Sequence, residues 1–254
     1  MTKVAAIIQA RVGSTRLPWK VLMGIVGKPM LWHVIERVKK AKLVDEVVLA
    51  TTSRKEDKPL LNLAKKSGIK SYAGSDEDVL DRYFQAATKF GADIIVRITA
   101  DCPLIDPEII NKVIKHFLDG GFDYVSNTLK LSYPDGLDVE VFSYGALKKA
   151  WDGANMASER EHVTPYIKKN PELFKIGSME HKQDLSGMRW CVDTEEDLKF
   201  VREVYKRLHR KGKIFYMQDI LNLLEKHPEL MEINKGIARD EGYATSLRED
   251  RPVR

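Results

Sequence analysis

Cysteine is scarce in this chain of 254 residues, which contains only Cys102 and Cys191. The two cysteines stand far apart, and neither belongs to a Cys-x-x-Cys or Cys/His pattern. The sequence therefore indicates neither a disulfide framework nor a zinc site. We expect both cysteines to be buried free thiols.

Long apolar runs are also missing. No run approaches the roughly 18 to 20 residues that span a bilayer, and the start MTKVAAIIQAR lacks the layout of a signal peptide. We therefore expect no membrane association and a cytoplasmic location. Repeats, low-complexity tracts and Gly/Ser linkers are absent as well. This favours one domain over residues 1–233, with a change of topology near 128–135, and a weakly ordered polar tail over 234–254.

Charge of one sign does not gather in long blocks. The net charge is +5 and the pI is near 9, but Lys and Arg alternate with Asp and Glu along most helical stretches. No basic patch is interleaved with aromatic residues, so a nucleic-acid partner is disfavoured. A basic pocket for small anionic molecules explains the excess of positive charge equally well.

Apolar residues follow a repeated strand-helix pattern in the first half of the chain. The continuous apolar run VAAIIQA (4–10) predicts a buried parallel strand, and similar strands are expected over 45–51, 69–74 and 93–99. Amphipathic helices are expected between them, over 29–41, 58–68 and 78–91. Repeated units of this kind predict a parallel sheet whose ligands bind at the carboxyl ends of the strands.

The pattern is less regular after residue 106. We expect helices at 108–121, near 145–151 and 158–170, and at 194–208 and 217–227, with strands at 122–127, 137–143, 174–179 and 188–193.

Three cations surround small residues in the loop that follows the first strand, ARVGSTRLPWK (10–20). Gly13 permits a close approach of the backbone, and the Ser14 hydroxyl and the guanidinium of Arg16 are donors that suit phosphate oxygens. The loop is neither a Walker loop nor a dinucleotide-binding fingerprint. It predicts a triphosphate site, and a solvated basic surface loop remains the alternative.

Two aspartates are candidate metal ligands. Asp101 follows the strand over 93–99, and Asp193 follows the strand expected over 188–193. If both lie at one edge of the sheet, their hard oxygen atoms suit Mg²⁺. The alternatives are that Asp101 forms a turn before Pro103 and that Asp193 caps the next helix.

Several ordered motifs resemble one family. ARVGSTRLPWK, TADCPLIDP and WCVDTEEDL, together with GKPMLWHVIERV, YPDGLDVEVFS, SEREHVTPYI and DEGYATSL, occur in the order found in the cytidylyltransferase family, which includes CMP-sialate and CMP-3-deoxy-manno-octulosonate synthetases. The resemblance implies a Rossmann-like, three-layer α/β/α fold of glycosyltransferase-A type with a mostly parallel central sheet. It also implies a nucleotide half at about 1–127, an acceptor and dimerisation half at about 128–233, and a homodimer.

The same resemblance implies the binding residues. The first loop binds CTP, with Arg16 and Lys20 as catalytic residues, and Asp101 and Asp193 bind Mg²⁺. The implied nucleotide-binding residues are Ala10, Arg11, Gly13, Ser14, Arg16, Lys20, Gly74, Ser75, Asp78, Arg82, Thr99 and Ala100. One departure matters: octulosonate synthetases carry a QGDEP-like sequence where this chain has TADCP, so the identity of the acceptor is not transferred.

The implied reaction moves CMP from CTP to a small anionic acceptor and releases pyrophosphate, in polysaccharide biosynthesis. The acceptor is a sugar acid or a phosphate or phosphonate compound. Its candidate contacts are Tyr133, Asp135, Asp138, Glu140, Arg160, Glu161 and His162. Arg160 and His162 suit an acidic group, although Arg160 with Glu161 also fits a solvated pair and His162 a structural role. Trp190 and Tyr166 either shape this pocket or belong to the core.

Two other functions remain open. A glycosyltransferase places a nucleotide and a metal at the same strand ends, but its Asp-x-Asp motif is missing because Asp101 begins the sequence DCP. A catalytically silent nucleotide-binding assembly protein is disfavoured because Arg16, Lys20 and both aspartates are intact.

Overall fold

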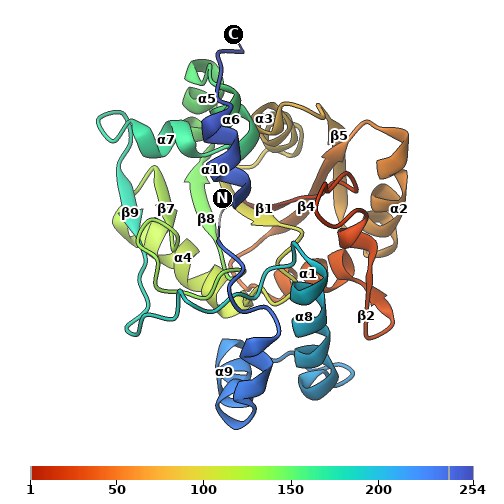
Figure 1. Ribbon diagram of the computed structural model, residues 1–254. Helices are drawn as coiled ribbons and strands as arrows, with labels where there is room; N and C mark the ends of the chain where they lie inside the picture. Colours follow the sequence, from red (N-terminus) through yellow and green to blue (C-terminus); the bar gives the residue numbers. More distant parts are fainter. Residues whose placement is uncertain (1, 240, 254) are drawn as a thin grey trace.

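A mostly parallel sheet forms the centre of the computed structural model, which describes residues 2–239 and 241–253 (Figure 1). Within these residues, seven strands follow the order β5-β4-β1-β6-β8-β7-β9, and only β8 runs antiparallel to its neighbours. The strands are β1 (Val4–Gln9), β4 (Glu46–Thr52), β5 (Lys70–Gly74), β6 (Ile94–Thr99), β7 (Tyr124–Ser126), β8 (Glu140–Ser143) and β9 (Ile176–Ser178). A separate small hairpin joins β2 (Gly24–Ile25) and β3 (Lys28–Pro29). The α/β fold class predicted from the sequence is confirmed.

Helices cover both faces of the sheet because successive strand residues point to opposite faces. In β1, Ala6 and Ile8 join one core cluster, and Ala5 and Ile7 join the other. The first cluster includes residues of α1 (Met30–Val38), α2 (Lys58–Lys66), α4 (Pro107–Gly120), α8 (Glu195–Leu208) and α9 (Met217–Lys226). The second includes residues of α3 (Val79–Phe90), α5 (Tyr144–Gly153) and α7 (Pro165–Lys169). The result is a three-layer arrangement.

Short helices complete the chain. They are η1 (Lys20–Leu22), η2 (Lys55–Asp57), α6 (Ala157–His162), η3 (Pro228–Glu232) and α10 (Glu241–Arg248). Among the described residues, every helix is too short or too polar to span a bilayer.

Helix ends follow the signals in the sequence. Asp78 caps α3 by accepting the backbone N–H of Asp81 at 2.8 Å, and Gly91 ends that helix with a φ of 61°. A residue with a side chain is strained at that φ, so glycine suits the position. Asp78 thus fixes where α3 begins, a few residues after the end of β5, and Gly91 fixes where it ends.

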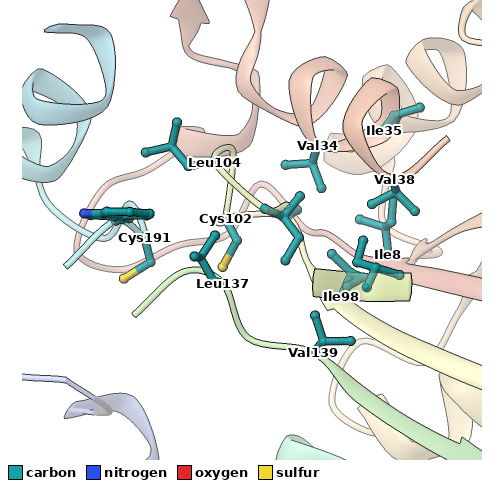
Figure 2. Close-up of a cluster of buried hydrophobic side chains, with 14 of the residues drawn as sticks. Ile8, Val34, Ile35, Val38, Ile98, Cys102, Leu104, Leu137, Val139 and Cys191 are labelled. Carbon is teal, nitrogen blue, oxygen red and sulfur yellow. The ribbon is translucent and has the colours of Figure 1, made fainter. Parts of the chain in front are cut away.

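The core lies directly behind the loops at the carboxyl edge of the sheet. In Figure 2 the side chains of Ile8, Ile98 and Val139 gather against α1, and those of Cys102 and Cys191 lie at the edge of the same cluster. Both cysteines are buried free thiols, as the sequence predicted. Burial raises the pKa of both well above the ordinary value, so they stay protonated.

The segment over 188–193 does not form the strand predicted from its sequence. Its described pairing is an isolated bridge between Asp135 and Arg189, together with a backbone hydrogen bond from Val192 to the carbonyl of Asp101 at 2.8 Å. A Cβ at Gly136, which has a φ of 102°, would stand 2.6 Å from the backbone of this segment. The segment therefore crosses the ends of other loops instead of extending the sheet.

Two other expectations change. The stretch over 158–170 is split into α6 and α7, because Val163 has a φ of 72° and Pro165 starts a new helix.

The tail over 234–254 was expected to be weakly ordered, yet residues 241–248 form α10. Figure 1 shows the chain running back from α9 and placing α10 beside α6. This tail is fastened by polar contacts: Ser158 donates to Asp250 at 2.7 Å, and Ala157 donates to the carbonyl of Arg251 at 2.9 Å.

A buried histidine makes stability depend on pH. His33 lies 2.7 Å from the carbonyl oxygen of Ile25 through Nε2, and burial lowers its pKa from 6.5 to about 4. The unfolded chain therefore takes up a proton below about pH 6.5, whereas the folded chain takes it up only near pH 4. We expect stability to be complete above pH 6.5 and to fall by up to about 3 kcal/mol as the pH drops to 4.

Urea unfolding of the wild-type chain and of His33→Gln at pH 7.0 and 4.5 measures this effect. The variant should be less stable at pH 7.0 but should lose less stability at pH 4.5. Equal losses in the two proteins would contradict the assignment to His33.

Candidate active site

The order in which strands are added to the sheet reverses between β1 and β6. β4 and β5 lie on one side of β1, and β6 lies on the other, with Gln9 and Thr99 in register at the two adjacent carboxyl ends. In an open α/β sheet such a point leaves a crevice between the loops that leave the two strands. A cavity of about 440 Å³ opens here.

Eight of the sequence candidates line this cavity. They are Arg16, Thr99, Asp101, Asp135, Asp138, Glu140, His162 and Asp193. Two nucleotide candidates, both metal candidates and four acceptor candidates thus meet in one space, although they come from segments far apart in the sequence. The other nucleotide candidates, Lys20 among them, are not part of this lining.

Lys20 is buried and joins two aspartates that line the cavity. Its Nζ donates to Asp101 Oδ2 at 2.9 Å, to Asp193 Oδ1 at 2.8 Å and to the carbonyl of Val192 at 2.9 Å. These three acceptors match the three N–H bonds of an ammonium group. Trp19, with a φ of 63°, turns the chain immediately before Lys20.

The charges of this cluster stabilise one another. Burial alone lowers the pKa of Lys20, but Asp101 and Asp193 raise it above its ordinary value. Burial also opposes ionisation of Asp101, yet Lys20 holds the pKa of that carboxyl well below its usual range. Both groups therefore carry their full charge at neutral pH.

Arg189 holds Asp193 from the other side. Its guanidinium donates to Asp193 Oδ2 at 2.8 Å, to Asp135 Oδ2 at 2.8 Å and to Asp197 Oδ1 at 3.0 Å. Thr194, and not Asp193, is the N-cap of α8, because its side chain accepts the backbone N–H of Asp197. Asp193 is therefore free of the capping role that the sequence left open, and it faces the cavity.

Arg16 bridges the first loop to the C-terminal helix. Its guanidinium contacts Asp193 Oδ1 at 2.9 Å and Glu241 Oε2 at 3.1 Å. Glu241 is the first residue of α10 and lines the cavity. A cation predicted to bind phosphate is thus held by carboxylates from two distant segments.

A second cluster lies beside the main cavity, where the first loop meets the segment after β5. Arg11 lies 4.0 Å from Asp76, and the buried Arg82 donates to the carbonyl of Ser75 at 3.1 Å. Asp57 accepts the backbone N–H of Val12 at 2.8 Å and fixes the start of the loop.

The remaining nucleotide candidates lie around these two clusters. The amide of Ala10 donates to the carbonyl of Ala50 at 3.1 Å, and that of Ala100 donates to the carbonyl of Gln9 at 3.1 Å. The Ser14 hydroxyl accepts the N–H of Leu17 at 3.3 Å. A Cβ at Gly13 would meet no described atom within 4 Å, whereas one at Gly74 would meet the Tyr72 ring.

Three of the acceptor candidates lie outside the cavity lining. Arg160 is buried, and its guanidinium donates to Asp78 at 2.9 Å and to the carbonyl of Trp151 at 2.8 Å. Arg160 and His162 are two residues apart on one helix, so their side chains leave it on different sides. The expectation that Arg160 receives an acidic group is therefore not supported.

Tyr133 and Glu161 are occupied elsewhere. Tyr133 is buried against His181, and its carbonyl accepts from Arg239 at 3.4 Å. Glu161 is half exposed and accepts the Ser246 hydroxyl at 2.8 Å. The two aromatic candidates follow the core alternative, because Trp190 is buried in the main cluster and Tyr166 packs against the second.

Further residues, which no sequence pattern had singled out, line the cavity. Gln9, Arg97 and Lys168 are part of it, as are Arg239, Glu241, Gly242 and Tyr243 of the tail. A signal was present for two of them, since Gln9 and Arg97 are the polar residues within otherwise apolar strands. A weaker signal existed for α10, whose acidic first residue and basic last residue, Glu241 and Arg248, suit the helix dipole.

A family comparison decides what kind of protein this is. The model of the cytidylyltransferase family matches residues 5–229. The chain is a member of the cytidylyltransferase family. This confirms the resemblance seen in the sequence and establishes the chain as a nucleotidyltransferase. The tail residues that line the cavity lie beyond the matched region.

Two relatives match most of the chain, and a third matches less than half of it. The uncharacterized protein MJ1063 of Methanocaldococcus jannaschii is 40% identical over 243 residues, which are 95% of this chain and 98% of MJ1063. The spore coat polysaccharide biosynthesis protein SpsF of Bacillus subtilis is 30% identical over 236 residues, which are 90% of this chain and 97% of SpsF. A 3-deoxy-manno-octulosonate cytidylyltransferase of Geobacter metallireducens is 41% identical over 114 residues, which are only 44% of this chain and 43% of that enzyme.

Solved structures share the fold. A cytidylyltransferase from Leptospira borgpetersenii superposes with a TM-score of 0.88 at 34% identity, covering 94% of this chain and all of that one. A CMP:2-keto-3-deoxy-manno-octonic acid synthetase complexed with CTP superposes with a TM-score of 0.64 at 22% identity, covering 81% of this chain and 99% of that one.

The homodimer and the cytoplasmic location that we expect from the sequence stay predictions.

Asp101 and Asp193 offer a donor set for a divalent cation that arrives with a nucleotide. Their oxygens contact the same Lys20 nitrogen at 2.9 and 2.8 Å, so they lie close together. The described residues contain no group of three or more His, Cys, Asp or Glu side chains suited to hold a metal ion. Mg²⁺ commonly uses one or two carboxylates together with substrate phosphates and water, and these two aspartates fit that pattern.

Removing the central ammonium should destabilise the metal-free protein. Lys20→Met leaves two neighbouring carboxylates without their shared cation. We expect a loss of about 2 to 3 kcal/mol in unfolding free energy at pH 7, because the aspartates are only partly exposed. Urea unfolding in the presence of a chelator measures this loss. Lys115→Met, which removes an exposed lysine, should cost much less, and Lys20→Met with Asp101→Asn should recover part of the stability. Equal effects of the two lysine variants would contradict the role of Lys20.

Proposed function

We propose that this protein transfers CMP from CTP to a small anionic acceptor, releases pyrophosphate, and requires Mg²⁺ held by Asp101 and Asp193. The observation that carries the proposal is the cluster of Lys20, Asp101 and Asp193 at the carboxyl ends of β1 and β6, in a member of the cytidylyltransferase family. Anionic phosphates need fixed cations beside them, and Arg16 and Lys20 meet this need.

The residues have distinct roles in the proposed reaction. An acceptor oxygen attacks the α-phosphorus of CTP in line, and the bond to pyrophosphate breaks. Arg16 and Lys20 stabilise the negative charge of the departing pyrophosphate. Bound Mg²⁺ would supply further neutralisation of phosphate charge. To contact the departing pyrophosphate, Lys20 and Arg16 must exchange their carboxylate partners for phosphate oxygens.

The acceptor class rests on the relatives and on the charged cavity. The name of SpsF places that protein in spore coat polysaccharide biosynthesis, and the octulosonate enzymes act on a sugar acid. By analogy we propose an acceptor that belongs to the synthesis of cell-surface polysaccharide. Family membership disfavours the glycosyltransferase alternative.

Pyrophosphate release tests the proposal. The protein is incubated with Mg²⁺ and each of the four ribonucleoside triphosphates, across a panel of sugar acids, phosphates and phosphonates. We expect release with CTP that depends on one acceptor class. Asp101→Asn should lower kcat by at least about 100-fold, because it removes a ligand for charge neutralisation. Asp119→Asn, at a carboxylate paired with Lys115 on the surface, is the matched control.

The outcomes separate the alternatives. Failure of CTP to bind would refute the proposal. CTP binding without release from any acceptor, together with unchanged binding in Asp101→Asn, would favour the silent nucleotide-binding protein.

The carboxylate of Glu241 should compete with triphosphate for Arg16. Glu241→Gln removes that competitor, so we expect the Kd for CTP to fall about 2- to 5-fold, as suits a partly exposed ion pair. Isothermal titration calorimetry measures the change. Glu249→Gln, which alters an exposed carboxylate of the same tail, should leave the Kd unchanged. Weaker CTP binding in Glu241→Gln would show that this carboxylate positions Arg16 instead of competing.

A further inference from the structure

A buried carboxylate on β8 has two cations beside it. Glu140 lies in register with Arg97 of the neighbouring strand β6, and the two side chains form an ion pair. Lys168 of α7 lies 3.4 Å from the other oxygen of Glu140. All three residues line the cavity.

The carboxylate of Glu140 is already well supplied with donors. Its Oε1 accepts from the hydroxyls of Tyr124 and Thr164, each at 2.6 Å, and its Oε2 accepts from Arg97. Lys168 is the third donor to Oε1, and its contact of 3.4 Å is longer than the other two. The cluster therefore has two positive charges against one negative charge, and Lys168 carries the surplus.

Arg97 also keeps donor capacity for a ligand. Within the described residues, its buried Nε has no hydrogen-bond partner. Close by, the acceptor atom Oε1 of Gln9 is buried and likewise lacks a described partner. Gln9 and Arg97 lie on neighbouring strands and both line the cavity. Buried donors and acceptors without a partner are costly, so a polar group of a ligand that reached these two atoms would be stabilised there.

His162 completes the wall of this part of the cavity. Its Nε2 lies 2.9 Å from the Ser246 hydroxyl, and its ring packs edge-on against Tyr243, with centroids 4.9 Å apart. The charged groups around it are Arg97, Lys168, Glu140 and Glu161. Burial lowers the pKa of His162, Arg97 and Lys168 lower it further, and the two glutamates oppose this effect.

We propose that Lys168, with Arg97 and His162, forms the subsite that receives the acidic group of the acceptor, a carboxylate or a phosphate. This inference rests on the proposed transfer to an anionic acceptor and names the residues that recognise it. It replaces Arg160, whose guanidinium is taken by Asp78 and by the carbonyl of Trp151. The ammonium of Lys168 turns from Glu140 to the incoming anion, and Glu140 remains paired with Arg97, Tyr124 and Thr164.

The experiment follows the imidazole of His162 by NMR in the full chain. The signals of the six histidines are assigned by single substitutions. Three probes are titrated into the free protein and into the protein with CMP: 3-deoxy-manno-octulosonate as a carboxylate, inorganic phosphate, and mannose as a neutral sugar. We expect at least one of the two anions, but not mannose, to raise the pKa of His162, because a nearby negative charge favours the imidazolium.

Lysine variants on α7 test the assignment of residues. Lys168→Met should weaken binding of the anion about 10- to 100-fold, and Lys168→Arg should restore most of it. Lys169→Met is the matched control, since Lys169 is the next residue of the same helix and faces Glu159 at 3.7 Å instead of the cavity. Which of the two anions binds more tightly identifies the acidic group.

The outcomes are separable from those of the nucleotide assay. Equal anion affinity in Lys168→Met and wild type, anion binding that leaves His162 unmoved, or no anion binding would each overturn the subsite, even if CTP binds. Anion binding at Lys168 in a protein that does not bind CTP would overturn its role as the acceptor subsite, together with the proposed function.

Discussion

Buried charges of opposite sign must be brought together, because an unpaired charge in the interior costs several kcal/mol. In this protein the requirement falls on Lys20, Asp101 and Asp193, which come from three segments far apart in the sequence. Backbone hydrogen bonds join these segments at two points, from Ala100 to the carbonyl of Gln9 and from Val192 to the carbonyl of Asp101. The ammonium adds a contact that holds the loop after β1, the loop after β6 and the segment before α8 together.

The same constraint extends outward through two arginines. Arg189 joins Asp193 to Asp135 and to the cap of α8, and Arg16 joins it to α10. Most charges of the cavity thus have a partner within the protein. A ligand that enters must exchange these partners, so its affinity reflects the difference between two sets of ion pairs and not the number of charges in the cavity. A site built in this way favours ligands with the same charge pattern as the groups they displace.

Much of the fold could be predicted from short-range patterns. Apolar runs such as VAAIIQA and the caps of α3 depend on neighbouring residues, so the strands and helices of the first half and the parallel sheet were predicted correctly. The carboxyl ends of the strands then located Arg16, Lys20 and Asp101. The conformation of 188–193 depends instead on Gly136 and Asp101, which are distant in sequence, and its strand-like pattern was misleading.

Two further features that the sequence did not predict share that cause. The direction of Arg160 depends on where α6 packs, and the order of the tail depends on polar contacts to Ser158 and Ala157 that no local pattern reveals. Polar composition alone made this segment resemble a disordered tail. The structure shows instead that the tail supplies Arg239, Glu241 and Tyr243 to the cavity, beyond the residues that the family model matches.

This contribution of the tail also determines when the cavity is completed as the chain is made. The strands and helices up to about residue 230 contain the apolar cores, so they have what they need to fold before residues 239–251 have left the ribosome. The wall of the cavity that the tail supplies, however, is added only after residues 239–251 emerge and fasten to α6. A chain cut short by a premature stop codon near residue 235 would then keep its core but leave the ribosome with an open cavity.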